Sequence, residues 1–245
     1  MYHVCFFPNA SKTDVILLGR KATLEPLNFP GICVEGELVS PSKCVRDLGL
    51  HLDQSLSMEP HVNKIRAAVF SRFRTLGRVR KLLTPFHRRL VVNSLVLSHF
   101  NFCASLLAGI EQKHINKLQS CYNAAMRLVR GAQRGSHLCS DAEDPLSVRQ
   151  HFYLRVLLLL RKTLKTGQPC YLNQSLQPYV PGRLLRSSEA NLLVIHRTRL
   201  KVTDRAFCAL APRLWNALSP DCRDLEAYDF AAKCAQWLQS RSSIS

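Results

Sequence analysis

Apolar residues recur every three or four positions between Val62 and Leu83, which is the spacing of one face of an α-helix. This apolar face consists of Val62, Ile65, Val69, Phe73, Leu76, Val79 and Leu83. At about 100° per residue, the opposite face carries Lys64, Arg74, Arg78 and Lys81. Arg72 and Arg80 fall on the edge of the apolar stripe or within it, so either their stems snorkel or the helix ends early. The pattern predicts an amphipathic helix beyond Ser57 with one basic face.

Capping residues predict further helices along the chain. Thr84 followed by Pro85 is typical of a helix start, and this second helix is expected to run to about Leu107, before Gly109. A third helix is expected from Glu111 to Arg130, ended by Gly131. Further helices are expected over residues 146–166, 205–218 and 227–238. Residues 132–146 have the composition of a linker, and residues 168–203 are expected to be irregular.

The first 57 residues favour β-structure. Two short apolar runs flank Glu35-Gly36-Glu37, which predicts a hairpin turn. Val45 to Leu52 is expected to form another strand, with Gly49 marking a bulge or a close backbone approach. The expected fold class is therefore α+β, with a small β-rich part, a mainly helical bundle and a partly irregular C-terminal region.

Positive charge is concentrated in the predicted helical bundle. The 245 residues include 34 Lys and Arg against 17 Asp and Glu, and 47% of them are hydrophobic, which is enough to form a core. Residues 61–135 hold 14 Lys and Arg and a single acid, Glu111, so they carry 14 − 1 = +13 of the net +17. Ordinary solvated faces mix both signs. The imbalance favours a polyanionic partner, nucleic acid before an anionic membrane surface, over a merely solvated face.

Several classes of protein lack support in the sequence. The longest run of Val and Leu, Val156 to Leu160, is far too short to cross a membrane, and no signal peptide is visible. The ten cysteines include no CxxC pair, so most of them are expected to be small buried residues in a reducing cytoplasmic or nuclear compartment. No catalytic motif or cluster of metal-binding carboxylates is present, so neither an enzyme nor a cofactor is expected.

An ordered series of short motifs runs along the chain: Pro8 to Gly19, Val45 to Asp53, Ser55-Leu56-Ser57, Lys117-Leu118-Gln119, Asn123-Ala124-Ala125, Arg127-Leu128, Leu185 to Ser188, Asp204 to Phe207 and Ala211 to Asn216. The series resembles the C-terminal part of a reverse transcriptase from non-LTR (LINE-type) retrotransposons. Each motif is weak alone, but together they span nearly the whole chain in the family's order. The resemblance implies a palm remnant at 1–57, a thumb-like basic helical domain at 58–135 and a C-terminal region at 136–245.

The resemblance also implies roles for individual residues. Lys12 takes the place of a palm lysine, and Leu48 and Gly49 take the place of the primer-gripping turn. The basic helices would contact RNA, DNA or an RNA–DNA hybrid through Lys64, Arg74, Arg78, Lys81, Lys113, Lys117, Arg127 and Arg130. The Mg²⁺ used by the parent family would be held by an Asp-Asp motif that this chain does not contain, so a non-catalytic fragment is expected.

The chain also departs from the family pattern. The usual Asp-Tyr-Cys is Asn101-Phe102-Cys103, the His-Trp-Leu-Pro before Val148-Arg149 is missing, Thr203 replaces a Gly, and Tyr122 replaces a Gln. Two other functions remain open: a helical protein-interaction module, and an unselected remnant that leaves Leu17, Leu18 and Leu48 without partners. Simpler interpretations of single residues also stand, with Lys12 in an ordinary turn and Trp215 in the core.

Overall fold

The computed structural model describes residues 9–132, 146–181, 191–223 and 228–241. Its fold is mixed α+β, as predicted, and 58% of the described residues are helical and 9% are in strands or bridges. The contacts divide the chain into two compact units, Met1–Ile65 and Arg66–Ser245. The predicted linker at 132–146 lies almost wholly outside the described residues.

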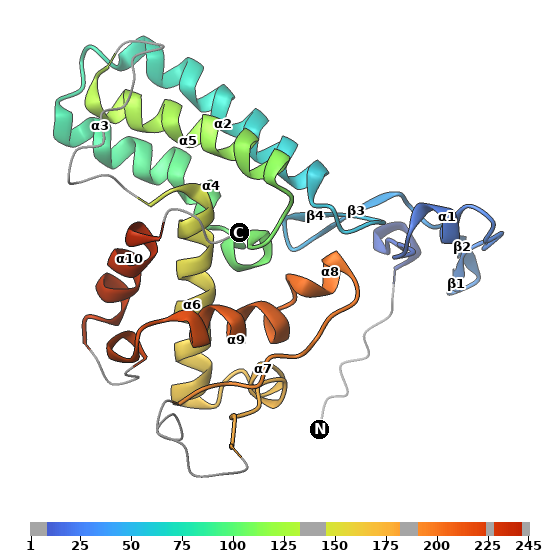
Figure 1. Ribbon diagram of the computed structural model, residues 1–245. Helices are drawn as coiled ribbons and strands as arrows, with labels where there is room; N and C mark the ends of the chain where they lie inside the picture. The colour runs from blue at the N-terminus through green and yellow to red at the C-terminus, as the bar shows by residue number, and fades with distance from the viewer. Residues whose placement is uncertain (1–8, 133–145, 182–190, 224–227, 242–245) are drawn as a thin grey trace, which may run out of the picture. The chain divides into compact units, whose positions relative to one another are not determined.

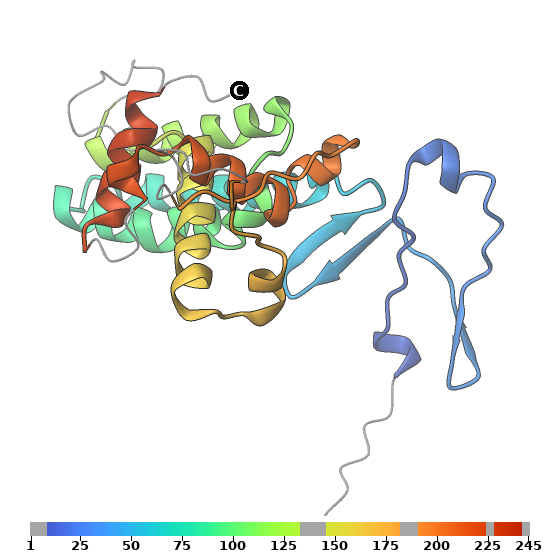
Figure 2. The same ribbon diagram turned by 60° about the horizontal axis from the view of Figure 1, so that its bottom comes forward.

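The first unit is built from two separate hairpins (Figure 2). It contains a 3₁₀ turn η1 (Ala10–Lys12), a short helix α1 (Lys21–Leu24), and four strands: β1 (Ile32–Val34), β2 (Glu37–Val39), β3 (Cys44–Asp47) and β4 (Leu50–Asp53). β1 pairs antiparallel with β2 around the predicted Glu35-Gly36 turn, and β3 pairs antiparallel with β4. Val15 forms only an isolated bridge to Pro41 and no strand.

The predicted single strand from Val45 to Leu52 is wrong, because the chain reverses at its centre. Leu48 and Gly49 both have positive φ, 45° and 92°, and they connect β3 to β4. A two-residue turn with positive φ at both positions matches the twist of a hairpin, and glycine adopts that conformation without strain. Gly49 therefore marks a turn and not a bulge.

The helices of the second unit largely follow the predicted pattern. α2 (Glu59–Val79) crosses from the first unit into the second and ends before Leu83, and α5 (Gln112–Arg130) ends at Gly131 in the left-handed conformation. Later come α6 (Val148–Thr166), α7 (Cys170–Gln174), α8 (Lys201–Asp204), α9 (Phe207–Ala217), η4 (Pro220–Cys222) and α10 (Phe230–Ser240). α7 and α8 are two short helices inside the segment expected to be irregular.

The second predicted helix begins as expected but ends early. Thr84 caps α3 (Pro85–Val92) by accepting a hydrogen bond from the His87 N–H, and the helix continues through a π-helical segment η2 (Asn93–Leu97) into α4 (Ser98–Asn101). Cys103 then adopts φ 51°, and a separate 3₁₀ turn η3 (Ala104–Leu107) follows. This break lets Ala104 and Leu107 become buried where η3 contacts α6.

α6 is the centre of the core of the second unit (Figure 1). It contacts η3, α5, α9 and α10, and it buries Phe152, Val156, Leu157 and Leu160. Its N-terminus is closed by a capping box in which Ser147 and Gln150 exchange hydrogen bonds between side chain and backbone. Gln150 also donates a hydrogen bond of 2.6 Å to the Leu238 carbonyl at the end of α10.

Replacing Ser147 by alanine is expected to cost about 1 kcal/mol, because one orphan N–H of α6 loses its partner. The midpoint of urea denaturation should fall with an unchanged slope. Ser147→Asp is the matched control, since its carboxylate can accept the same Gln150 N–H and should preserve stability. An equal loss in both variants would show that the cap is not the cause.

Candidate nucleic-acid interface

The basic and apolar residues of α2 lie on opposite sides of the helix, as predicted. Val69 and Leu76 are buried, whereas Arg74 and Arg78 are exposed. Lys81 is exposed just beyond the end of α2. Lys64 is exposed on the part of α2 that belongs to the first unit.

The end of the predicted apolar stripe is less buried than expected. Phe73 and Leu83 are half-buried and Val79 is exposed. The helix stops at Val79, so Arg80 lies outside it and is exposed. Two explanations were offered for the position of Arg80, a snorkelling side chain and an early end of the helix. The early end is confirmed for Arg80.

The basic residues of α5 face away from its buried side, which is formed by Ile115, Leu118, Cys121 and Ala125 among others. Lys113 forms an ion pair with Glu111 at 2.7 Å between Nζ and Oε2, and this hydrogen bond and charge lower the pKa of Glu111. Lys117 and Arg127 are half-buried, and Arg130 is exposed in the last turn. Glu111 thus offsets part of the charge of Lys113.

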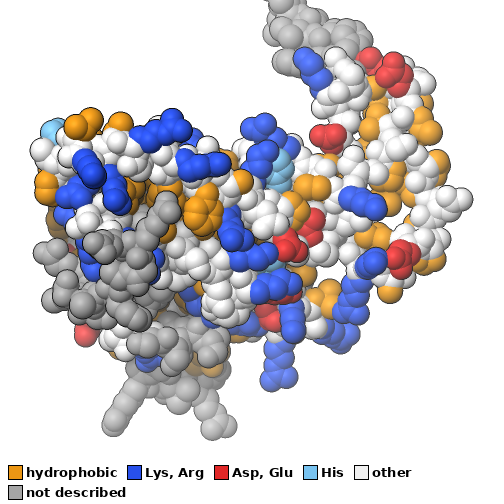
Figure 3. All heavy atoms as spheres, turned by 90° about the horizontal axis from the view of Figure 1, so that it is seen from above, with side chains coloured by type: hydrophobic (Ala, Val, Ile, Leu, Met, Phe, Trp, Pro, Cys, Tyr) orange, Lys and Arg blue, Asp and Glu red, His pale blue; other side chains and the backbone are white. Residues whose placement is uncertain are grey.

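A cavity of about 760 Å³ lies among α2, α3 and α5, and we call it the basic cavity. Its lining combines apolar and cationic side chains: Phe70, Phe73, Leu83 and Leu128, with Arg74, Arg80, Lys81, Arg88 and Arg127. No acidic side chain of the described residues lines it. Viewed from above in Figure 3, Lys and Arg side chains (blue) and apolar side chains (orange) lie side by side over these helices.

The Arg88 side chain lines the basic cavity, and its Nε atom is buried. No described residue accepts a hydrogen bond from this atom. The guanidinium packs against Gly131, where an added Cβ would lie 2.2 Å from the Arg88 Nη1 atom. Gly131 therefore has two structural roles. It adopts φ +71° at the end of α5, and its lack of a side chain leaves space for Arg88.

Sequence reasoning missed part of the basic cavity. Phe73 was expected to be core, and Phe70, Arg80 and Arg88 were not predicted to bind a ligand, although all four line the cavity. The available signal was a high density of arginines on both sides of the turn between α2 and α3, next to aromatic residues. Arg74, Lys81 and Arg127 are the predicted phosphate-binding residues that the cavity brings together.

The predicted site residues of the first unit lie in turns. Lys12 is exposed at the end of η1, where the Asn9 side chain accepts hydrogen bonds from the Ser11 N–H and hydroxyl and Thr13 donates to the Asn9 carbonyl. These bonds confirm the interpretation of this segment as a local turn. Leu48 is 92% exposed at the β3–β4 turn. Leu18 is also exposed and Leu17 is half-buried.

The segment after β4 has a structural role in starting α2. The Asp53 carboxylate accepts hydrogen bonds from the Ser55 hydroxyl and from the backbone N–H groups of Ser57 and Met58. Burial raises the pKa of Asp53, but these hydrogen bonds outweigh burial and lower it below the ordinary value. The Asp53-x-Ser55-x-Ser57 pattern is therefore explained by local hydrogen bonding.

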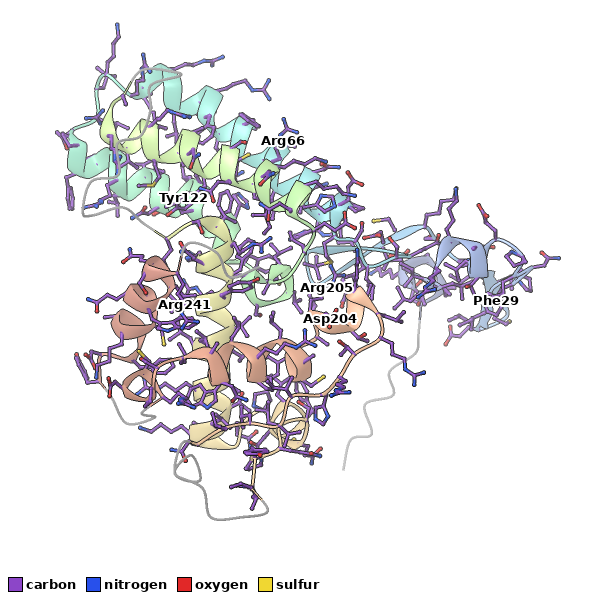
Figure 4. All side chains as sticks on the ribbon, in the orientation of Figure 1. Phe29, Arg66, Tyr122, Asp204, Arg205 and Arg241 are labelled. Atoms are coloured by element: carbon purple, nitrogen blue, oxygen red, sulfur yellow. The ribbon has the colours of Figure 1, made fainter. Side chains whose placement is uncertain are left out.

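Two of the C-terminal motifs, around Asp204 (labelled in Figure 4) and Ala211 to Asn216, have structural roles, whereas Leu185 to Ser188 lie outside the described residues. Arg213 on α9 forms an ion pair with Asp204 at 3.0 Å, and Thr198 donates to the same carboxylate. Asn216 accepts a hydrogen bond from the Leu193 N–H and donates one to the Leu193 carbonyl. Trp215 is completely buried, which confirms its assignment to the core. These contacts attach the segment before α8 to α9.

Other chemistry finds no support among the residues that the structure covers. No group of three or more His, Cys, Asp or Glu side chains there is placed to hold a metal ion. No helix in the described ranges is long and apolar enough to span a bilayer. The expectation that most cysteines are buried is wrong, because only three of the eight described are buried: Cys121, Cys222 and Cys234. The exposed ones include Cys33 and Cys44, on hairpins that bury few side chains.

Comparisons with protein-family models, with curated proteins and with solved structures found no match to this chain. The likeness to a retrotransposon reverse transcriptase therefore stays a prediction that rests on the motifs alone.

Proposed function

We propose that this chain is a non-catalytic relative of the C-terminal part of a LINE-type reverse transcriptase and that α2, α3 and α5 bind RNA, DNA or an RNA–DNA hybrid. The observation that carries the proposal is the net positive charge of residues 61–135, which include 14 Lys and Arg but only one acidic residue. Arg74, Arg78, Lys81 and Arg130 are exposed, so a phosphate backbone can reach them. Such contacts position a nucleic acid without selecting its sequence.

The motif series supports the family part of the proposal. In this hypothesis residues 58–135 correspond to a thumb that lies along a template–primer duplex. The chain has no Asp-Asp motif, and the proposal assigns it no polymerase activity. Lys12, Leu48 and Gly49 are then residues inherited from a palm, whose present positions are explained by local turns.

The affinity for an RNA–DNA hybrid is expected to fall steeply with salt, because each phosphate that a cation neutralises releases counterions. Fluorescence anisotropy across a salt series measures the slope of log K against log salt concentration. Replacing Arg74, Arg78 and Lys81 by Gln should reduce the slope by about 0.9 for each phosphate left without its cation on a B-DNA-like duplex. Lys113→Gln is the matched control, since Lys113 is already paired with Glu111. A flat response, or no binding at low salt, would contradict the proposal.

A second candidate function is a protein-interaction module, and one surface favours it. Leu82, Phe86 and Leu90 follow one another at steps of four and are 84%, 71% and 53% exposed. Phe86 and Leu90 lie on one face of α3, and Leu82 lies in the turn before it. Exposed apolar side chains on one helix face are a common feature of helices that dock to a partner. Failure to bind nucleic acid at low salt by a cooperatively folded chain would favour this second function.

A further inference from the structure

We propose that the basic cavity accepts one unpaired nucleotide of a nucleic-acid strand, with its base against Phe70 and Phe73 and its phosphate on the surrounding guanidinium groups. This inference rests on the proposed function, because it names the part of a nucleic acid that the helices select. It adds a preference for single-stranded ends that a uniformly charged face would not have.

The aromatic part of the cavity can accommodate a flat ring. Phe70 and Phe73 lie edge to face, with ring centroids 6.0 Å apart and planes at 78°. Phe70 is 42% exposed even though it lines the cavity, so part of its ring surface is free to stack. The Arg66 guanidinium lies 5.7 Å from the Phe70 centroid and supports the ring by a cation–π contact. Bases stack on such rings whatever their sequence.

The polar part of the cavity attracts an anion. Arg74, Arg80, Lys81 and Arg88 line it, and none of them forms an ion pair within the described ranges. The Nε atom of Arg88 is buried and lacks an acceptor there, which is costly. The planar guanidinium fork matches the spacing of phosphate oxygens.

The combination of the two parts selects a nucleotide over simpler ligands. An inorganic anion would leave the apolar lining unused, and an uncharged aromatic molecule would leave the cations unpaired. The volume of about 760 Å³ falls in the range of roughly 300–1,000 Å³ that is usual for small-molecule pockets. A base inside a duplex cannot enter, because it is paired and stacked. An unpaired nucleotide at a strand end or in an overhang satisfies each of these conditions.

The test compares a blunt-ended RNA–DNA hybrid with the same hybrid carrying a short single-stranded overhang, by anisotropy at fixed salt. The full chain is expected to bind the overhang substrate about tenfold more tightly. Phe70→Leu and Phe73→Leu, which remove the stacking surface but keep apolar volume, should abolish this preference. The matched control is Phe86→Leu, because Phe86 is exposed on α3 outside the cavity and its loss should leave the preference intact.

The outcomes separate this inference from the function on which it rests. Equal affinity for the two substrates, or a preference that survives both cavity variants, would overturn the cavity proposal and leave salt-dependent duplex binding standing. A loss of preference in Phe86→Leu as well would also overturn it. If neither substrate binds at low salt, the proposed function itself fails. If Phe73→Leu does not fold, Phe70→Leu decides, because the partly exposed ring of Phe70 contributes less to the core.

Discussion

Trp215→Ala is expected to lower the free energy of unfolding of the helical unit by about 3–5 kcal/mol. Trp215 is completely buried on α9, and its ring centroid lies 6.2 Å from that of Phe230 on α10. Its indole N–H donates a hydrogen bond of 2.7 Å to the Asn191 carbonyl. Truncation leaves both a large cavity and an unsatisfied acceptor. Since domains are stable by only about 5–15 kcal/mol, this one change removes much of the margin.

Urea denaturation followed by far-UV circular dichroism measures this effect. Trp215→Phe should give a smaller loss, because it keeps most of the ring and removes only the donor. The matched control is Tyr228→Ala, since Tyr228 is a fully exposed aromatic residue and its loss should change stability by less than about 0.5 kcal/mol. Equal effects at Trp215 and Tyr228 would refute the role of Trp215 in the core. A wild-type chain without a cooperative transition would favour the interpretation as an unselected remnant.

The second large effect is a loss of stability on acidification that depends on His151. Burial of the ring, with the Arg155 charge beside it, lowers the pKa of His151 from 6.5 to about 4. Below pH 6.5 the unfolded chain takes up a proton at this residue that the folded chain refuses. Stability must therefore decrease as the pH falls from about 6.5 to about 4, and the decrease ends below that pKa.

The full shift corresponds to roughly 3 kcal/mol, and partial solvation of the ring reduces the expected loss to about 2 kcal/mol. His151→Gln should flatten this part of the curve of stability against pH, measured by urea denaturation at several pH values. Burial also lowers the pKa of His61 and His99, so a smaller loss should persist in the variant. A curve of unchanged shape in His151→Gln would refute the prediction.

Asn101→Asp provides an independent test of the same site. The Asn101 side-chain oxygen accepts hydrogen bonds from His151 Nε2 at 2.8 Å and from Arg155 at 2.9 Å. A carboxylate there would strengthen both contacts, raise the pKa of His151 and stabilise the fold by about 1 kcal/mol below pH 6.

Local chemistry explains which expectations succeeded. The Thr84-Pro85 start, the Gly131 stop and the apolar stripe of α2 are determined by neighbouring residues, and the structure contains all three. The second helix failed at Cys103, because burying Ala104 and Leu107 at α6 requires a turn that no local signal announces. The strand through Gly49 failed because a central glycine is compatible with either a bulge or a turn.

By itself, the sequence determined the α+β class, most helices of the second unit and the basic face opposite the apolar face of α2. Those features follow from periodicity, capping and charge, which act over a few residues. Only the tertiary structure showed that Phe70, Phe73, Arg80 and Arg88 join Arg74, Lys81 and Arg127 around one cavity. The reason is physical: a cavity depends on how three helices pack, and packing brings together residues more than 50 positions apart in the chain, such as Arg74 and Arg127.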